Sequence, residues 1–96
     1  MEVSETFFKE LYYIYEYIKL KLDNVSAADK FADEAMDTAY SLEYSPFRYQ
    51  IIKGAVREVK VSNYYIYYSV NEQFKIVYIH HILYKGMDIT NIAIGN

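Results

Sequence analysis

The chain of 96 residues contains no cysteine, no long apolar run and no excess of positive charge. Without cysteine it can form neither a disulfide bond nor a thiolate metal site, which suits a reducing cytoplasm. No segment approaches the roughly 20 apolar residues of a membrane span, and the opening Met1-Glu2-Val3 does not begin a signal peptide. The sequence therefore predicts a soluble protein of the cytoplasm that binds no membrane.

The net charge of −3 also limits the possible functions. It argues against a protein that depends on general attraction to phosphates, because such domains usually carry a basic excess. A local basic patch stays compatible with this balance. The length fits a single domain over residues 1–96, and a chain this short has a modest core, so a bound partner adds much to its stability.

Tyrosine is the abundant residue, with 13 in 96 positions, far above normal usage. Because tyrosine packs like an apolar residue yet still needs a hydrogen bond, this enrichment fits a partly exposed binding surface. An AT-rich genome would produce the same enrichment. Composition alone leaves both explanations open.

The first half of the chain is helical by pattern. Ser4 is the predicted N-cap of a first helix, because its hydroxyl can accept a hydrogen bond from a free backbone N–H. Apolar residues at spacings of three and four then form one stripe on a helix of about five turns. The predicted stripe consists of Phe8, Leu11, Tyr15, Ile18 and Leu22.

A second helix is predicted after residues 24–26, with Ser26 and Asp29 as a capping box. Its alanine-rich buried face would let it approach the first helix closely as an antiparallel hairpin. That face consists of Ala28, Phe31, Ala32, Ala35, Ala39 and Leu42. On the other side Asp29, Asp33 and Asp37 form either a solvated face or a contact for a basic partner, and their spacing does not suit a compact metal site.

The segment from Ala55 to Tyr84 predicts three successive antiparallel strands, broken at residues 62–63 and 71–73. Pro46 ends the helical region, so residues 47–54 form a connecting loop or an edge strand. The last strand is apolar on both faces and should lie inside the sheet. We expect an α+β fold: a two-helix antiparallel hairpin packed on a small antiparallel sheet, in the order β-α-α-β-β-β, with a short first strand at Glu2-Val3.

Few residues in the strands offer chemistry. Arg57 is in phase with Val59 and Val61, and it serves either as an ion pair or cap on exposed carbonyls, or in recognition of a phosphate or carboxylate. His80 and His81 are adjacent in a strand. Their side chains are therefore expected on opposite faces, where they could not bind one metal together.

Three motifs follow the helices in order: Ser45-Pro46-Phe47-Arg48-Tyr49, the strand pair from Val56 to Tyr68, and the segment from Ile82 to Asp88. Their order and spacing resemble the RelE/ParE superfamily of type II toxin–antitoxin toxins, or plasmid stabilisation proteins, over nearly the whole chain. The resemblance implies a toxin that arrests bacterial growth and a cognate antitoxin. It also implies two mechanisms, inhibition of DNA gyrase in the ParE-like branch and ribosome-dependent mRNA cleavage in the RelE-like branch.

The chain departs from the pattern of the nuclease branch, which carries basic residues at several positions along these strands and after the last one. At those positions this chain has Val56, Glu58, Tyr65 and Gly86. RNA cleavage needs groups that move a 2′-hydroxyl proton and stabilise charge on the phosphate. The first strand is also shorter than the family's usual five or six residues. The resemblance therefore favours a gyrase inhibitor that acts by binding, with no enzymatic activity, cofactor or metal.

Two alternatives remain at this point. One is a ribosome-dependent endoribonuclease with an atypical site, for which the candidates are Arg57, Lys60, His81 and Tyr84. The other is a degenerate toxin that only binds its antitoxin and represses the shared operon. In every case we expect the antitoxin to lie across the helical hairpin and the sheet as a helix in a groove, with or without an added strand. Its predicted contacts are Tyr12, Tyr15, Tyr65 and Tyr67.

Overall fold

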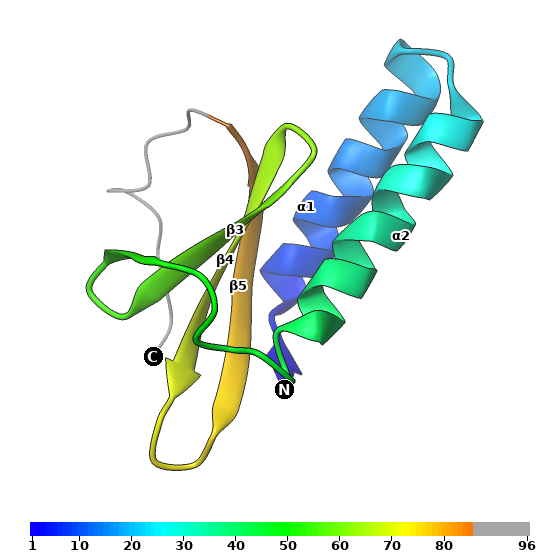
Figure 1. The fold of residues 1–96 in the computed structure, drawn as a ribbon. Coiled ribbons are helices and arrows are strands. Elements are labelled where there is room, and N and C mark those ends of the chain that lie inside the picture. The colour runs from blue at the N-terminus through cyan, green and yellow to red at the C-terminus, as the bar shows by residue number, and fades with distance from the viewer. Residues whose placement is uncertain (86–96) are drawn as a thin grey trace.

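The computed structural model describes residues 1–85, and within them two long helices lie on one face of a five-stranded sheet (Figure 1). The helices are α1 (Glu5–Glu16), continued by the short π-helix η1 (Tyr17–Lys21), and α2 (Val25–Ser41). The strands are β1 (Glu2–Val3), β2 (Ile51–Lys53), β3 (Val56–Val61), β4 (Tyr64–Asn71) and β5 (Ile76–Tyr84). The expected α+β fold with a helical hairpin is confirmed.

The strands follow the order β1-β5-β4-β3-β2 across the sheet. From β2 to β5 all neighbours are antiparallel, but β1 runs parallel to β5, with Glu2 opposite Tyr78 and Val3 opposite Ile79. The prediction of a purely antiparallel sheet is therefore wrong at this edge. The direction of β1 is set by contacts with the other end of the chain, which no local pattern reports.

The remaining strand predictions are confirmed. β5 lies between β1 and β4, as its apolar residues on both faces indicated, and β2 supplies the edge strand expected within residues 47–54. The β3–β4 turn falls at Ser62-Asn63, where Ser62 has a φ of 56°. In the β4–β5 turn the Asn71 side chain accepts a hydrogen bond of 3.1 Å from the Phe74 N–H.

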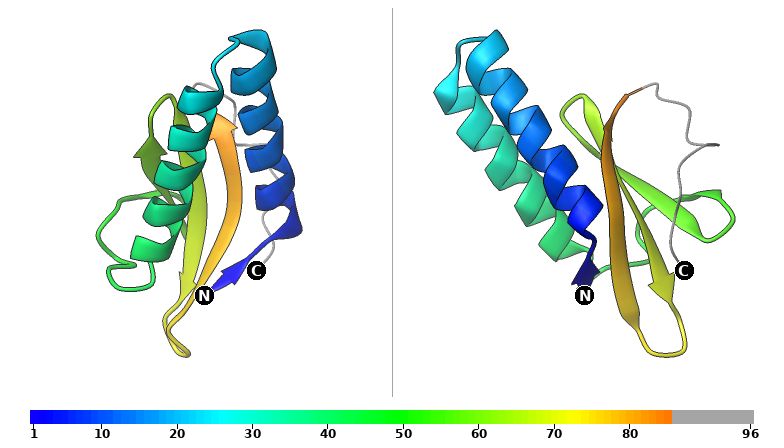
Figure 2. Two further views of the ribbon diagram at one scale, coloured as in Figure 1. Left: turned by 90° about the vertical axis from the view of Figure 1, so that its right-hand side faces the viewer. Right: turned by 180° about the vertical axis from the view of Figure 1, so that it is seen from behind.

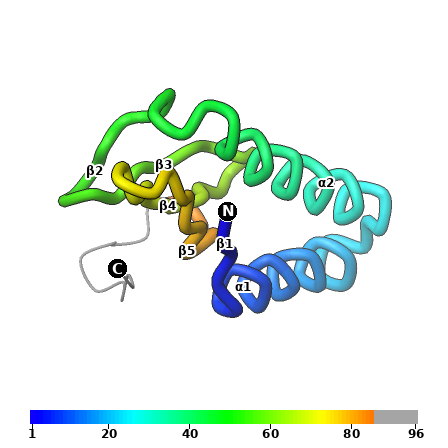
Figure 3. Tube along the Cα trace, turned by 90° about the horizontal axis from the view of Figure 1, so that it is seen from below, coloured from blue at the N-terminus to red at the C-terminus, as the bar shows by residue number. Residues whose placement is uncertain are grey.

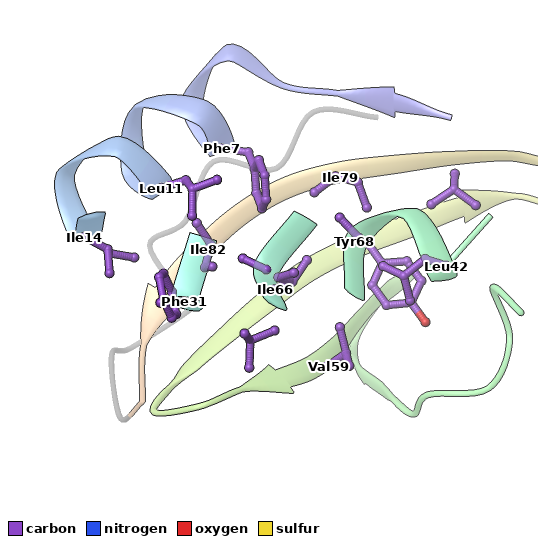
Figure 4. Close-up of a cluster of buried hydrophobic side chains, with 14 residues drawn as sticks. Phe7, Leu11, Ile14, Phe31, Leu42, Val59, Ile66, Tyr68, Ile79 and Ile82 are labelled. Atoms are coloured by element: carbon purple, nitrogen blue, oxygen red, sulfur yellow. The ribbon is translucent and has the colours of Figure 1, made fainter. Parts of the chain in front are cut away.

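The core lies between the helical hairpin and the sheet (Figure 4). On α1 it is formed by Phe7, Leu11 and Ile14, with Ile18 packed against it. The predicted stripe is wrong in phase, because Phe8 is 48% exposed and Leu22 58% exposed, whereas Phe7 is fully buried. Both series contain Leu11 and Ile18, so spacing alone did not separate them.

On α2 the predicted buried face is confirmed at Ala28, Phe31, Ala35, Ala39 and Leu42, while Ala32 is half-buried. The cap prediction is wrong. Asn24 is the N-cap and accepts a hydrogen bond of 2.9 Å from the Ala27 N–H, so the helix begins at Val25 and Ser26 lies within its first turn.

The acidic side of α2 is exposed to solvent, which is compatible with both alternatives. Asp29, Asp33 and Asp37 are all exposed. Asp29 also accepts a hydrogen bond of 2.6 Å from the Tyr15 hydroxyl, which ties α1 to α2. The hairpin leans away from the sheet toward its η1 end, so the two layers diverge there (Figures 1 and 2).

Ser4 joins β1, α1 and β5. Its Oγ accepts a hydrogen bond of 2.9 Å from the Phe7 N–H and donates one of 2.7 Å to the His80 carbonyl. We expect Ser4→Ala to lower the free energy of unfolding by about 1–2 kcal/mol, measured by urea denaturation. Ser26→Ala is the matched control and should change it by less than about 0.5 kcal/mol, because Ser26 is exposed and caps nothing. Equal effects would contradict this assignment of the caps.

Candidate functional site

A groove of about 570 Å³ lies between α1 and the last residues of β5, where the hairpin leans away from the sheet. One wall consists of side chains spaced by three and four residues along α1 and into η1, including Glu10 and Tyr13 of α1 and Tyr17 of η1. The other wall consists of Tyr64 on β4 and residues 82–84 on β5. The groove is thus open and rich in tyrosine.

The groove tyrosines present large apolar rings to solvent. Tyr13 is 74% exposed, Tyr84 56% and Tyr17 45%. The Tyr64 ring packs edge-on against Tyr84 at 5.5 Å between centroids and against Phe31 at 5.1 Å, and its burial raises the pKa of the Tyr64 hydroxyl. Rings that the fold holds in place yet leaves exposed are suited to bury against a partner.

Glu10 forms the polar part of the groove. Its Oε1 accepts a hydrogen bond of 3.0 Å from the Ile82 N–H, and its Oε2 lies 3.1 Å from His81 Nδ1. β1 pairs with β5 only as far as Ile79, so among residues 1–85 no strand pairs with this edge of β5 at Ile82. The carboxylate therefore satisfies an edge N–H that would otherwise be open to another strand.

A β-bulge interrupts β5 at the two histidines that were predicted to face opposite sides. Tyr68 lies opposite Ile79 and Tyr67 opposite His81, so His80 is an extra residue in the ladder. Ile79 and Ile82 both remain buried in the core, with two residues between them instead of one. The bulge therefore removes both histidines from the regular alternation on which the prediction rested.

The two histidines have separate partners. His80 Nε2 lies 2.7 Å from Ser69 Oγ, and burial, with a smaller contribution from His81, lowers the pKa of His80. His81 lies against Glu10. Within residues 1–85 no group of three or more potential metal ligands comes together. The polar pairs hold the bulge and the β5 edge in place.

Arg57 holds the loop that follows α2. Its guanidinium donates hydrogen bonds to the carbonyl of Tyr49 at 2.6 Å and to that of Phe47 at 3.5 Å. Beside it the Tyr68 hydroxyl donates to the Pro46 carbonyl at 2.8 Å. Of the two roles open from the sequence, the structure shows the cap on exposed carbonyls.

We expect Arg57→Ala to lower the free energy of unfolding by about 1–3 kcal/mol, because two carbonyls lose a charged donor. Urea denaturation measures this, and Lys60→Ala is the control, since Lys60 is exposed on the same strand. If Arg57→Ala instead abolished growth arrest at unchanged stability, Arg57 would act on the target.

The four candidate nuclease residues do not converge. Arg57 lies opposite Tyr68, whereas Tyr84 lies opposite Tyr64, about 13 Å farther along β4. Lys60 alternates with the buried Val59 and Val61, so it points away from the helices. Gly86, which belongs to the third motif, lies outside the described residues, and so does Asp88.

The four predicted antitoxin contacts lie on two layers. Tyr12 is exposed on α1, and Tyr15 is bound to Asp29. Tyr65 and Tyr67 alternate with core residues of β4 and point away from the helices, and Tyr67 is buried. One helix of a partner could not cover all four. Sequence reasoning missed the groove itself, although the spacing of Glu10, Tyr13 and Tyr17 marks a single face of α1.

The sequence was compared with models of known protein families. Residues 1–89 match the family model of the ParE toxin of type II toxin-antitoxin system, parDE. The chain belongs to the ParE toxin family. Because the toxins of this family act in toxin–antitoxin pairs, family membership implies that this ParE toxin has an antitoxin as its partner. No curated protein matches the sequence. No helix within residues 1–85 of the toxin is long and apolar enough to cross a membrane.

Proposed function

We propose that this ParE-family toxin arrests growth by binding DNA gyrase, and that it does not cut RNA. The observation that supports this most is the separation of Arg57, Lys60 and Tyr84 over two faces and two ends of the sheet. A nuclease needs its base and its charge-stabilising groups within hydrogen-bond reach of one phosphate. A protein that acts by binding does not.

The residues nearest to a catalytic pair are engaged in holding the fold. His81 lies against Glu10, which also takes the Ile82 N–H, and Arg57 donates to two carbonyls. Each missing oxyanion-stabilising group typically lowers a catalytic rate about a hundredfold. An enzymatic mechanism would therefore have to proceed with little electrostatic support.

We also propose the groove between α1 and β5 as the place where the antitoxin binds. It offers exposed tyrosine rings for the apolar side chains of a partner, whereas the Ile82 N–H at the edge of β5 is already bonded to Glu10. These features suit peptide recognition by a helix in a groove. Glu10 adds a negative charge that suits a basic residue of the partner.

The mechanism is tested by running two assays on one preparation of toxin freed of antitoxin. We expect gyrase supercoiling to be inhibited and translated messages to remain uncut, and induced expression to give filamentation and a DNA-damage response. The toxin–antitoxin complex is the inactive control. Cleavage in the ribosomal A site with normal supercoiling would overturn the proposal, and inactivity in both assays would favour a degenerate toxin that only binds its antitoxin.

A further inference from the structure

The end of the molecule opposite to η1 carries a second surface of a different kind. There the loop after α2, β2 and the β4–β5 turn lie together, and Figure 3 views the molecule from this side. We call the following residues the cation–aromatic patch: Phe47, Arg48, Tyr49, Arg57, Phe74 and Lys75. None of them lines the groove.

Cations and rings alternate in this patch. Two cations lie over the Phe47 ring, with Arg57 Cζ 5.2 Å and Lys75 Nζ 5.9 Å from its centroid. Arg48 Cζ lies 5.5 Å from the centroid of Tyr49. Much of the apolar surface remains open, because Phe47 is 43% exposed and Phe74 65%. The patch therefore offers flat rings and positive charges side by side.

The positive charges of the patch are not neutralised by ion pairs within residues 1–85. The ion pairs found there join the N-terminus to Glu43 and His81 to Glu10. Arg57 Nη1 donates hydrogen bonds to two carbonyls, but the other N–H groups of the Arg57 guanidinium have no hydrogen-bond acceptor within residues 1–85. The β4–β5 turn contains one acidic residue, Glu72, and one basic residue, Lys75. The patch itself carries three positive charges, on Arg48, Arg57 and Lys75, in a chain whose net charge is −3.

We propose that the cation–aromatic patch binds single-stranded nucleic acid. A single strand alternates a phosphate with an unpaired base, and it can place phosphates on Arg48 and Lys75 while a base stacks on the exposed Phe74 ring. An acidic peptide would use the cations but leave the exposed rings without flat partners. A duplex hides the faces of its bases. The proposal is independent of the groove and of gyrase inhibition.

The test measures fluorescence anisotropy of a labelled oligothymidylate of about 12 nucleotides with the full-length toxin, over a series of salt concentrations. The two phosphate contacts, to Arg48 and Lys75, predict a slope of log K against log salt of about −1.4. Arg48→Ala and Lys75→Asn should each reduce its magnitude by about 0.7, and asparagine tolerates the φ of 57° at this position. Phe74→Ala should weaken binding at least about fivefold at unchanged slope.

Lys21→Ala and Lys30→Ala are the matched controls, because both lysines are exposed on the helical hairpin and their removal changes the net charge equally. We expect these variants to bind as the unchanged protein does. No saturable binding at low salt would overturn the proposal, and so would an equal loss in the controls. A polyglutamate peptide that competes with the same dependence on Arg48 and Lys75 would also overturn it, since it would identify an acidic protein segment as the ligand.

Discussion

Phe7→Ala is expected to lower the free energy of unfolding by about 3–5 kcal/mol. The Phe7 side chain is fully buried in the core, where the hairpin meets the sheet (Figure 4), so its loss removes apolar contacts and leaves a cavity. Small domains have roughly 5–15 kcal/mol of stability in total. The variant should therefore unfold at a much lower urea concentration, and little toxin should accumulate in cells.

Phe8→Ala is the control, because the two residues are adjacent, equal in size and on the same helix. Phe8 is 48% exposed, and its ring contacts Phe7 edge-on at 5.7 Å between centroids. Its removal should therefore cost only about 0.5–1.5 kcal/mol. The stripe predicted from sequence spacing requires the reverse order. A larger loss for Phe8→Ala would show that α1 is rotated from the position described here.

The second large effect concerns the proposed antitoxin groove. Tyr13→Glu should weaken antitoxin binding by about a hundredfold or more, because binding would bury a carboxylate in an apolar wall beside Glu10. The fold should be unaffected, since Tyr13 is 74% exposed. Isothermal titration of refolded toxin with the antitoxin's C-terminal segment measures the affinity, and thermal unfolding measures the stability.

Two further variants define the extent of this surface. Tyr44→Glu is the matched control, because Tyr44 is 87% exposed and lies outside the groove. The affinity of this variant for the antitoxin segment should stay unchanged. Tyr12→Glu tests whether the antitoxin also covers the neighbouring side of α1, as the sequence predicted. Equal affinities for Tyr13→Glu and the unchanged toxin would exclude the groove as the binding site.

Local signals in the sequence predicted the elements of this fold well. Ser4 before an apolar periodic segment marked the start of α1, and the polar breaks at residues 62–63 and 71–73 marked two hairpin turns. The placement of Arg57 on the core side of β3 also followed from its phase with Val59 and Val61. These features depend on neighbours within a few residues, which a sequence displays directly.

The errors arose where two neighbouring residues fit one local rule equally well. Phe7 and Phe8 both fit an apolar stripe with Leu11, and Asn24 and Ser26 are both good N-caps. Packing against the sheet decided the first choice, and the start of α2 at Val25 decided the second. The bulge at His80 could not be predicted from the sequence, because it is defined by the pairing of β5 with β4.

The groove was missed for a different reason. It exists because the hairpin leans away from the sheet near η1, and such a tilt is a property of the packed layers (Figure 2). The candidate site residues were chosen by type and phase, and the structure shows that phase did not bring them together. Arg57 and Tyr84 share a face of the sheet yet lie about 13 Å apart along it.

The parallel pairing of β1 with β5 means that β1 has no strand to pair with until β5 has been synthesised. Glu2 lies opposite Tyr78, and the Ser4 hydroxyl bonds to His80, so the start of α1 is fixed only when nearly the whole chain has been made. Contacts this distant in sequence slow folding, since the chain must close a long loop before it gains them. A prematurely terminated product that lacks β5 would leave Phe7 and Ile14 without the strand they pack on. Incomplete translation should therefore release fragments in which neither the core nor the groove between α1 and β5 has formed.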